Sequence, residues 1–338
     1  MRTIEWKNGV VTTIDQTKLP TKTVLLKMRK CSEVATSIKT MQMRGAPLIG
    51  VAAAYGLALT AYHSRAEKRE QLMKELEASA EGLKRTRPTA VNLFWAVDRV
   101  MKRAWETVGG VEAVAGAVVE EAQRMADEDV EVNRKIGENG AALIKDGDVV
   151  LTHCNAGSLA TVDYGTALGV IRAAWDQGKK IEVVATETRP KLQGARLTAY
   201  ELMRDGIPVT LITDSMVGFV MAKKQVNLVV VGADRVVKDA VINKIGTYSV
   251  AVLAKEHGVP FYVAAPRSTM DLEHTSKDVV IEERDPEEVT GFRSERTAPD
   301  GIKVMNPAFD VTPMKYVRAL ITEVGVLSPE NLKELGGN

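Results

Sequence analysis

The feature that most constrains the fold is a change of pattern near residue 145. Beyond it, short runs of β-branched and apolar residues alternate with amphipathic stretches. This alternation predicts a Rossmann-like, doubly wound parallel α/β sheet with helices on both faces. The expected strands are VVLTH (149–153), IEVVAT (181–186), VTLI (209–212), LVVVG (228–232) and FYVAA (261–265). The expected helices lie at 161–177, 191–204, 214–224 and 247–257.

The chain before residue 145 follows a different pattern. Residues 3–17 predict a small β-hairpin, because β-forming runs flank the turn dipeptide Asn8-Gly9. From about residue 32 to residue 145, Ala, Leu, Glu, Lys and Met recur at helical spacing without a convincing strand. We therefore expect two domains. Residues 1–145 would form the hairpin and a mainly helical domain, and residues 146–338 the Rossmann-like domain.

Composition narrows the classes of partner. The 338 residues include 45 Lys and Arg against 44 Asp and Glu, a formal charge of +1. This balance does not predict binding to nucleic acid or to a membrane. The apolar run Leu48–Leu59 suits a buried helix better than a membrane span, and the N-terminus lacks the apolar core of a secretory signal. Two cysteines, Cys31 and Cys154, suggest reduced thiols and a cytoplasmic location.

The end of the first expected strand carries candidate functional groups. Parallel sheets bind ligands beyond the carboxyl ends of their strands, so the residues that follow each strand are the ones to inspect. The first expected strand leads into Cys154-Asn155-Ala156-Gly157, a turn whose backbone N–H groups suit an anion and favour the thiolate. Cys154 is equally consistent with an inert buried thiol. His153 is expected to pack away from Cys154, because adjacent strand residues face opposite sides.

The second and fourth strand ends add further polar groups. Gln193 follows the second, in a segment where Glu187 and Arg189 suit an ion pair. Asp234 follows the fourth, either satisfied by neighbouring N–H groups or by Arg235, or poised as a proton donor.

Three basic segments are candidates for holding a phosphate. Asn243 and Lys244 occupy a polar turn before an expected helix, where lysine suits phosphate but is also an ordinary surface residue. Arg44-Gly45-Ala46 and Arg87-Pro88 each place an arginine at a helix start, where the helix dipole disfavours it. A bound anion or a nearby glutamate would relieve that conflict. No histidine or cysteine spacing fits a metal, and neither GxGxxG nor a P-loop occurs. We therefore expect no metal and no cofactor.

Taken together, eight segments resemble the methylthioribose-1-phosphate isomerase family, within an initiation-factor-2B-like superfamily of sugar-phosphate isomerases and regulatory subunits. The resemblance runs in order from Ile4 to Pro313. Its motifs are RGAPLIG (44–50), RPTAVNLFWA (87–96), THCNAGSLAT (152–161), ETRPKLQGARLTAYEL (187–202), GADRV (232–236), NKIGTY (243–248), IEERDPEEV (281–289) and NPAFDVTP (306–313).

The resemblance implies an aldose–ketose isomerase that converts 5-methylthioribose 1-phosphate, a small sugar phosphate, into 5-methylthioribulose 1-phosphate in methionine salvage. It implies a homodimer with Cys154 and Asp234 as the catalytic pair. The residues that it implies for substrate binding are Arg44, Gly45, Ala46, Arg87, Gln193, Asn243 and Lys244. The backbone N–H groups of the turn at Asn155, Ala156 and Gly157 are further candidates for holding the phosphate. Two alternatives stay open: an isomerase of another 1-phosphorylated pentose, such as ribose 1,5-bisphosphate, and a non-catalytic regulatory subunit of a translation initiation factor.

Overall fold

The structure, a computed structural model, describes residues 2–292 and 295–335. The chain forms two compact units that are discontinuous in sequence. The first unit contains the chain up to Lys135 together with Ala156–Gly169. The second contains Ile136–Asn155 and the chain from Val170 onward. The chain therefore passes from the second unit back to the first directly after Asn155, at the end of the segment that contains Cys154.

The expected N-terminal hairpin is present. Strands β1 (Ile4–Lys7) and β2 (Val10–Ile14) pair antiparallel around Asn8 and Gly9, whose φ angles of 47° and 71° fit a two-residue hairpin turn. A third strand, β3 (Leu25–Met28), pairs with β2 and was not expected from the sequence.

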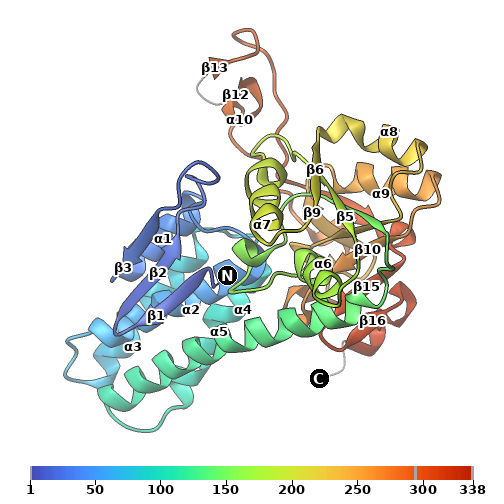
Figure 1. Ribbon diagram of the computed structural model, residues 1–338. Helices are drawn as coiled ribbons and strands as arrows, with labels where there is room; N and C mark the ends of the chain where they lie inside the picture. The colour runs from blue at the N-terminus through green and yellow to red at the C-terminus, as the bar shows by residue number, and fades with distance from the viewer. Residues whose placement is uncertain (1, 293–294, 336–338) are drawn as a thin grey trace. The chain divides into compact units, whose positions relative to one another are not determined.

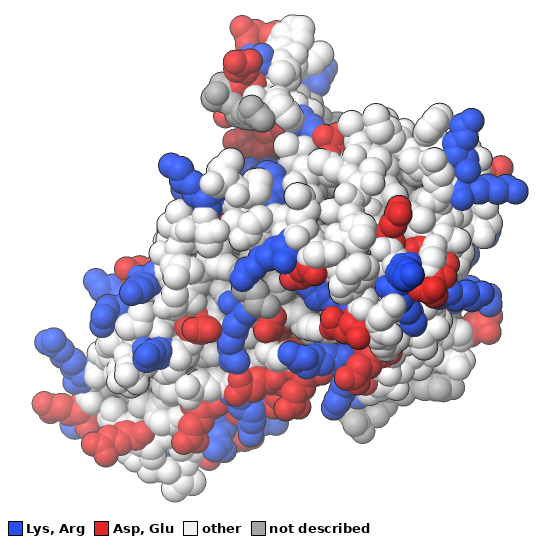
Figure 2. All heavy atoms as spheres, in the orientation of Figure 1, with Lys and Arg blue, Asp and Glu red and all other residues white. Residues whose placement is uncertain are grey.

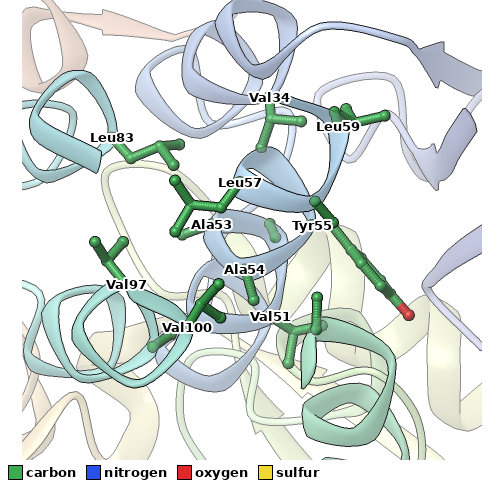
Figure 3. Close-up of a cluster of buried hydrophobic side chains, with 14 of the residues drawn as sticks. Val34, Val51, Ala53, Ala54, Tyr55, Leu57, Leu59, Leu83, Val97 and Val100 are labelled. Carbon is green, nitrogen blue, oxygen red and sulfur yellow. The ribbon is translucent and has the colours of Figure 1, made fainter. Parts of the chain in front are cut away.

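Helices make up the rest of the first unit, as the sequence predicts. They are α1 (Cys31–Lys39), α2 (Ala46–His63), α3 (Arg69–Lys84), α4 (Val91–Glu106) and α5 (Val111–Ala141), the last of which continues into the second unit. Helix α2 is central: its Ala53 and Leu57 face Leu83 of α3 and Val97 and Val100 of α4 (Figure 3). By length and composition α2 could cross a membrane, but 78% of it is buried, as in the core helix of a globular unit.

Helix α5 has many charged residues, and some of them form ion pairs with the neighbouring helix α4. Acidic and basic side chains mix along it (Figure 2). Arg99 of α4 binds Glu121 and Glu128 of α5, each at 2.6 Å. Apolar residues such as Val118 and Ala122 form a buried stripe beside these glutamates on the same helix.

A seven-stranded sheet forms the centre of the second unit, and all five expected strands are confirmed. Its order is β16-β15-β10-β7-β4-β5-β6, parallel except for β16 (Figure 1). The strands are β4 (Val149–Thr152), β5 (Glu182–Thr186), β6 (Val209–Ile212), β7 (Leu228–Val231), β10 (Phe261–Ala264), β15 (Ala319–Thr322) and β16 (Gly325–Leu327). The last two were not expected. The fold class, a doubly wound α/β unit with a helical N-terminal part after a small hairpin, is confirmed.

Helices cover both faces of this sheet. Val220 of α8 (Val217–Ala222) and Ala251 of α9 (Thr247–Glu256) pack with strand residues on one face. On the other face, α6 (Ala167–Asp176) and α7 (Ala199–Arg204) are joined by an Arg172–Glu201 ion pair of 2.8 Å. The expected helix at 161–177 begins only at Ala167, and the one at 191–204 opens with a π-helical turn, Gly194–Thr198.

A second, four-stranded sheet corrects one expectation. Its order is β11-β8-β9-β14, with β8 (Arg235–Val237), β9 (Ala240–Lys244), β11 (Met270–Asp271) and β14 (Phe309–Pro313). Asn243 and Lys244 were expected in a turn, but they end strand β9 and pair with Asp310 and Phe309 of β14. Beyond this sheet lie the short helix α10 (Glu287–Thr290) and the two-residue strands β12 (Gly291–Phe292) and β13 (Glu295–Arg296).

Candidate functional site

Cys154 lies two residues after β4 in a backbone conformation that is rare for this residue type. Its φ is 65°, in the left-handed region. Two threonines hold its peptide groups: the Cys154 N–H donates to Oγ1 of Thr188 at 2.9 Å, and the Thr198 hydroxyl donates to the Cys154 carbonyl at 2.6 Å. The thiol is free of any disulfide and half-buried. Backbone strain of this kind collects at functional sites.

Thr188, which holds Cys154, is itself strained. Its φ is 64°, an outlier for a β-branched residue. The Asp214 carboxylate fixes the turn by accepting the N–H groups of Thr188 and Arg189 at 2.8 and 2.7 Å. The Arg189 guanidinium binds the Val289 carbonyl and stacks on Phe292, so its contacts differ from the ion pair with Glu187 that the sequence suggested.

His153 ties the end of β4 to two other segments. Nε2 lies 2.8 Å from the Ile245 carbonyl, which can only accept, so Nε2 donates. Nδ1 lies 2.6 Å from the Thr186 hydroxyl at the end of β5. Burial lowers the pKa of His153, which keeps the ring neutral, so Nδ1 accepts from Thr186. A Cβ at Gly246 would lie 2.8 Å from the ring, so the 245–246 turn rests directly on it.

Asp234 lies three residues after β7 and beside β9. Strand β7 is the direct neighbour of β4, so Cys154 and Asp234 follow adjacent parallel strands at the same edge of the sheet. The Asp234 N–H donates to the Ile242 carbonyl at 3.0 Å, one residue before Asn243. Arg235, considered from the sequence as its partner, instead binds Asp271.

The end of β9 places three polar groups together. Asn243 Nδ2 donates to the Thr247 hydroxyl at 3.1 Å, and Lys244 Nζ donates to the Ala308 carbonyl at 2.8 Å. Asp310 accepts the N–H groups of Gly246 and Tyr248 at the start of α9, at 2.7 and 3.1 Å. Burial raises the pKa of Asp310 to about 6, against the opposing effect of these N–H groups and of the Lys244 charge.

Gln193 is the clearest unsatisfied group in this region. It is 3% exposed, and its Oε1 has no hydrogen-bond partner among the described residues. A buried amide oxygen without a partner is costly unless a ligand or a water supplies one. Gly194 follows, where a Cβ would lie 1.7 Å from the Thr186 carbonyl, so only glycine fits there. The π-helical turn that starts at Gly194 is a rare feature that is often found at functional sites.

Asn155 links the cysteine turn to a buried charge network. Its Nδ2 contacts Oε1 of Glu201 at 2.9 Å and the Thr198 hydroxyl at 3.2 Å. Glu201 is 2% exposed, and its other oxygen accepts from Arg172 at 2.8 Å. A buried glutamate is held in this way by an arginine and an amide, which fixes the orientation of Asn155.

The remaining predicted residues belong to the first unit. Arg44 is buried, and Gly45 (φ 102°) is the N-cap of α2. A Cβ on Gly45 would lie 2.5 Å from Ala160, so the Arg44–Ala46 turn lies against the segment that follows Ala156. Arg87 is half-buried and donates to the Met41 sulfur at 3.5 Å.

Ala156 and Gly157 open that segment within the first unit. The Ala156 carbonyl accepts the Leu168 N–H at 3.2 Å, and Gly157 forms a β-bridge with Gly165.

The predicted residues thus fall into two groups. Cys154, Asn155, Gln193, Asp234, Asn243 and Lys244 lie in the second unit, and Arg44, Gly45, Ala46, Arg87, Ala156 and Gly157 lie in the first. Sequence reasoning missed Thr188, Thr198, Glu201 and Asp310. Each lies inside a segment that the sequence singled out, but its residue type alone does not predict its contact: a backbone group for Thr188, Thr198 and Asp310, and the side chains of Asn155 and Arg172 for Glu201. Among the described residues, no three His, Cys, Asp or Glu side chains gather as a metal site would require.

Comparisons with known proteins identify the family. The model of the initiation factor 2 subunit family matches residues 42–329. A methylthioribose-1-phosphate isomerase from Thermosipho africanus is 56% identical over 338 residues, covering 98% of this chain and 97% of that protein.

Two solved structures cover nearly the whole chain. The 5-methylthioribose 1-phosphate isomerase of Pyrococcus horikoshii has a TM-score of 0.92 at 49% identity, covering 99% of this chain and 95% of that one. A structure from A. fulgidus described as translation initiation factor eIF-2B, subunit delta, has a TM-score of 0.88 at 55% identity, covering 98% and 97%.

Proposed function

Because the chain belongs to the initiation factor 2 subunit family, we propose that it is the isomerase of that family which converts 5-methylthioribose 1-phosphate into 5-methylthioribulose 1-phosphate. The observation that carries this proposal is full-length identity above 50% to relatives named methylthioribose-1-phosphate isomerase. Methionine salvage is the proposed setting of the reaction. The motif resemblance found in the sequence is confirmed at the level of the family.

Cys154 and Asp234 are the proposed catalytic pair. They follow the adjacent strands β4 and β7, so one ligand at this edge can reach both. The substrate carries phosphate on its anomeric carbon, which prevents the ring from opening to a free aldehyde. Asp234, acting as a general acid, would donate a proton to the ring oxygen and so open the ring. Hydrogen then passes from C2 to C1, through Cys154 as proton carrier or as a direct hydride shift beside it.

Two sets of residues are proposed to hold the substrate. In the second unit these are Gln193, Asn243, Lys244 and Asn155, of which Gln193 has an unsatisfied buried oxygen that suits a sugar hydroxyl. In the first unit they are Arg44, Gly45, Ala46, Arg87, Ala156 and Gly157. Their support is the motif resemblance, together with the packing of Gly45 against Ala160 within the first unit.

The test of this function is side-by-side turnover of 5-methylthioribose 1-phosphate and ribose 1,5-bisphosphate. We expect the methylthio sugar to give the higher kcat/KM. Preference for the bisphosphate would replace the proposed substrate. Solvent deuterium at C1 of the product would identify proton transfer, and full retention of the C2 hydrogen would identify the hydride shift.

A second candidate function is regulation of translation, which the name of the A. fulgidus structure favours. It predicts stable co-purification with an initiation factor and no isomerase turnover. Measurable turnover of either sugar phosphate would reject a purely regulatory role.

The cellular setting is proposed to be the cytoplasm, with the chain acting as a homodimer. The support is two cysteines that form no disulfide, the family resemblance and a small phosphorylated substrate. Light scattering on the purified chain should give twice the 36.8 kDa mass of one chain, and a monomer mass would reject the dimer.

A further inference from the structure

A groove of about 880 Å³ opens at the edge of the large sheet that is opposite to Cys154 and Asp234. It is lined by residues that precede β10 and β15 and by the end of α9. Because these strands run parallel to β4 and β7, residues that precede them lie at the amino-end edge. The groove is therefore separate from Cys154 and Asp234, although it belongs to the same unit of the chain as these two residues.

The groove has a cationic rim. Lys255, Lys315 and Arg318 line it with exposed side chains, against one acidic residue, Glu330. Lys255 Nζ lies 5.3 Å and Lys315 Nζ 5.2 Å from the centre of the same Tyr316 ring. Their ammonium groups therefore lie within about one Debye length of each other, about 10 Å at 0.1 M salt. Among the described residues, none of these three cations forms an ion pair.

Such a cluster gives the groove a positive local potential. Like charges at this spacing repel each other, and a carboxylate between them would be the usual structural remedy. Elsewhere in the chain arginines are paired in that way, as Arg284 is with Glu288 at 2.8 Å. The groove lacks this arrangement, so its field favours a ligand that carries several negative charges.

The floor of the groove is apolar and aromatic. Val259, Pro260, Phe261, Met314 and Val317 line it beside the Tyr316 ring. Tyr248 packs edge-on against that ring at 5.7 Å between centroids, which holds it in place. The volume leaves room for more than a single phosphate, so a ligand with an apolar body as well as charge can fit.

We propose that this groove is a second ligand site, for a nucleotide-like molecule that has two or more phosphate charges and a flat apolar ring. The phosphates lie among Lys255, Lys315 and Arg318, and the ring lies on the apolar floor. This site is independent of the isomerase reaction, so its test does not depend on the proposed function.

The probe is ADP, titrated calorimetrically into the full chain at low salt without divalent cations. We expect binding that weakens about tenfold or more in the double variant Lys255→Gln, Lys315→Gln, because two charge-assisted contacts are lost. The matched control is Lys223→Gln, a lysine that lies over the Phe219 ring at 5.8 Å, outside the groove. The control should bind ADP as the unmodified chain does. Circular dichroism checks that all the variants fold.

Three results would overturn the site. The first is the absence of ADP binding to the unmodified chain at millimolar concentration. The second is equal affinity in the double variant, which would place ADP elsewhere, including in the substrate site. The third is pyrophosphate binding as tightly as ADP. Pyrophosphate has no ring, so this result would mean that the apolar floor contributes nothing to the affinity.

Discussion

The Thr198 hydroxyl donates a 2.6 Å hydrogen bond to the backbone carbonyl of Cys154. The same hydroxyl accepts from Asn155 at 3.2 Å, and Thr188 accepts the Cys154 N–H at 2.9 Å. Cys154 would otherwise relax from its φ of 65°, since this region is unfavourable for a residue with a Cβ. Two threonines from the segment after β5 therefore set the direction in which the thiol at the end of β4 points.

Thr198→Val should lower kcat about tenfold with little change in KM, because the shape is kept while the bond that positions Cys154 is lost. The rate of thiol alkylation by iodoacetamide should change as well, which a purely structural defect would not produce in a folded protein. Thr198→Ser restores the hydroxyl and should recover both values. Failure of serine to rescue them would contradict this role.

Cys154→Ser and Asp234→Asn should each lower turnover of 5-methylthioribose 1-phosphate about a hundredfold or more, the usual size of an acid–base contribution. Cys31→Ser is the matched control, because Cys31 is the other free cysteine and packs in the core of the first unit. Steady-state kinetics with 5-methylthioribose 1-phosphate measure kcat for all three variants. Near-normal turnover in either site variant removes that residue from the mechanism.

Gln193→Ala should raise KM about tenfold, because its buried Oε1 lacks a partner among the described residues until substrate supplies a hydroxyl. Gln177→Ala, an exposed glutamine after α6, provides the comparison and should leave KM unchanged. An unchanged KM in Gln193→Ala would mean that the oxygen faces a water instead.

Stability should depend on pH through Asp129, whose carboxylate accepts the Val162 N–H at 2.7 Å. Burial raises its pKa to about 7 from an ordinary 3.8, so the folded chain keeps a proton that the unfolded chain releases. The free energy of unfolding therefore falls as pH rises from about 4 to about 7, and then levels off.

Asp129→Asn removes that titration. The free energy of unfolding is measured with urea at pH 5 and at pH 7.5 in both chains. The difference between its two values should be smaller in Asp129→Asn than in the unmodified chain, by more than about 1 kcal/mol. Asp127→Asn, whose side chain is 67% exposed, should not change it. An identical pH dependence in Asp129→Asn would show that Asp129 is ionised in the folded state.

Gly194→Ala should destabilise the chain and lower activity, because the new methyl group would overlap the Thr186 carbonyl at 1.7 Å. Gly116→Ala is the matched control in helix α5, where a Cβ meets nothing within 4 Å. It should raise the free energy of unfolding by about 0.5–1 kcal/mol. Thermal melts of both variants test the contrast, and equal melting temperatures would contradict it.

The sequence predicts the large sheet well and the small one poorly. Strands such as β7 are uninterrupted apolar runs because both faces are covered, so the signal is strong. Strands β8 and β11 have three and two residues, too few for any period to show. Asn243 and Lys244 were misplaced in a turn because their pairing with β14 joins positions more than sixty residues apart.

By itself, the sequence determined the α/β architecture of the second unit, the helical character of the first, the family, and a set of candidate residues at strand ends. These follow from local periodicity and motif order, which need no distant contact. Only the tertiary structure decided that β4 and β7 are neighbours, that Thr188 and Thr198 hold Cys154 in a left-handed conformation, and that Gln193 is buried. Strand order, backbone strain and burial arise from contacts between distant segments, so no local pattern encodes them.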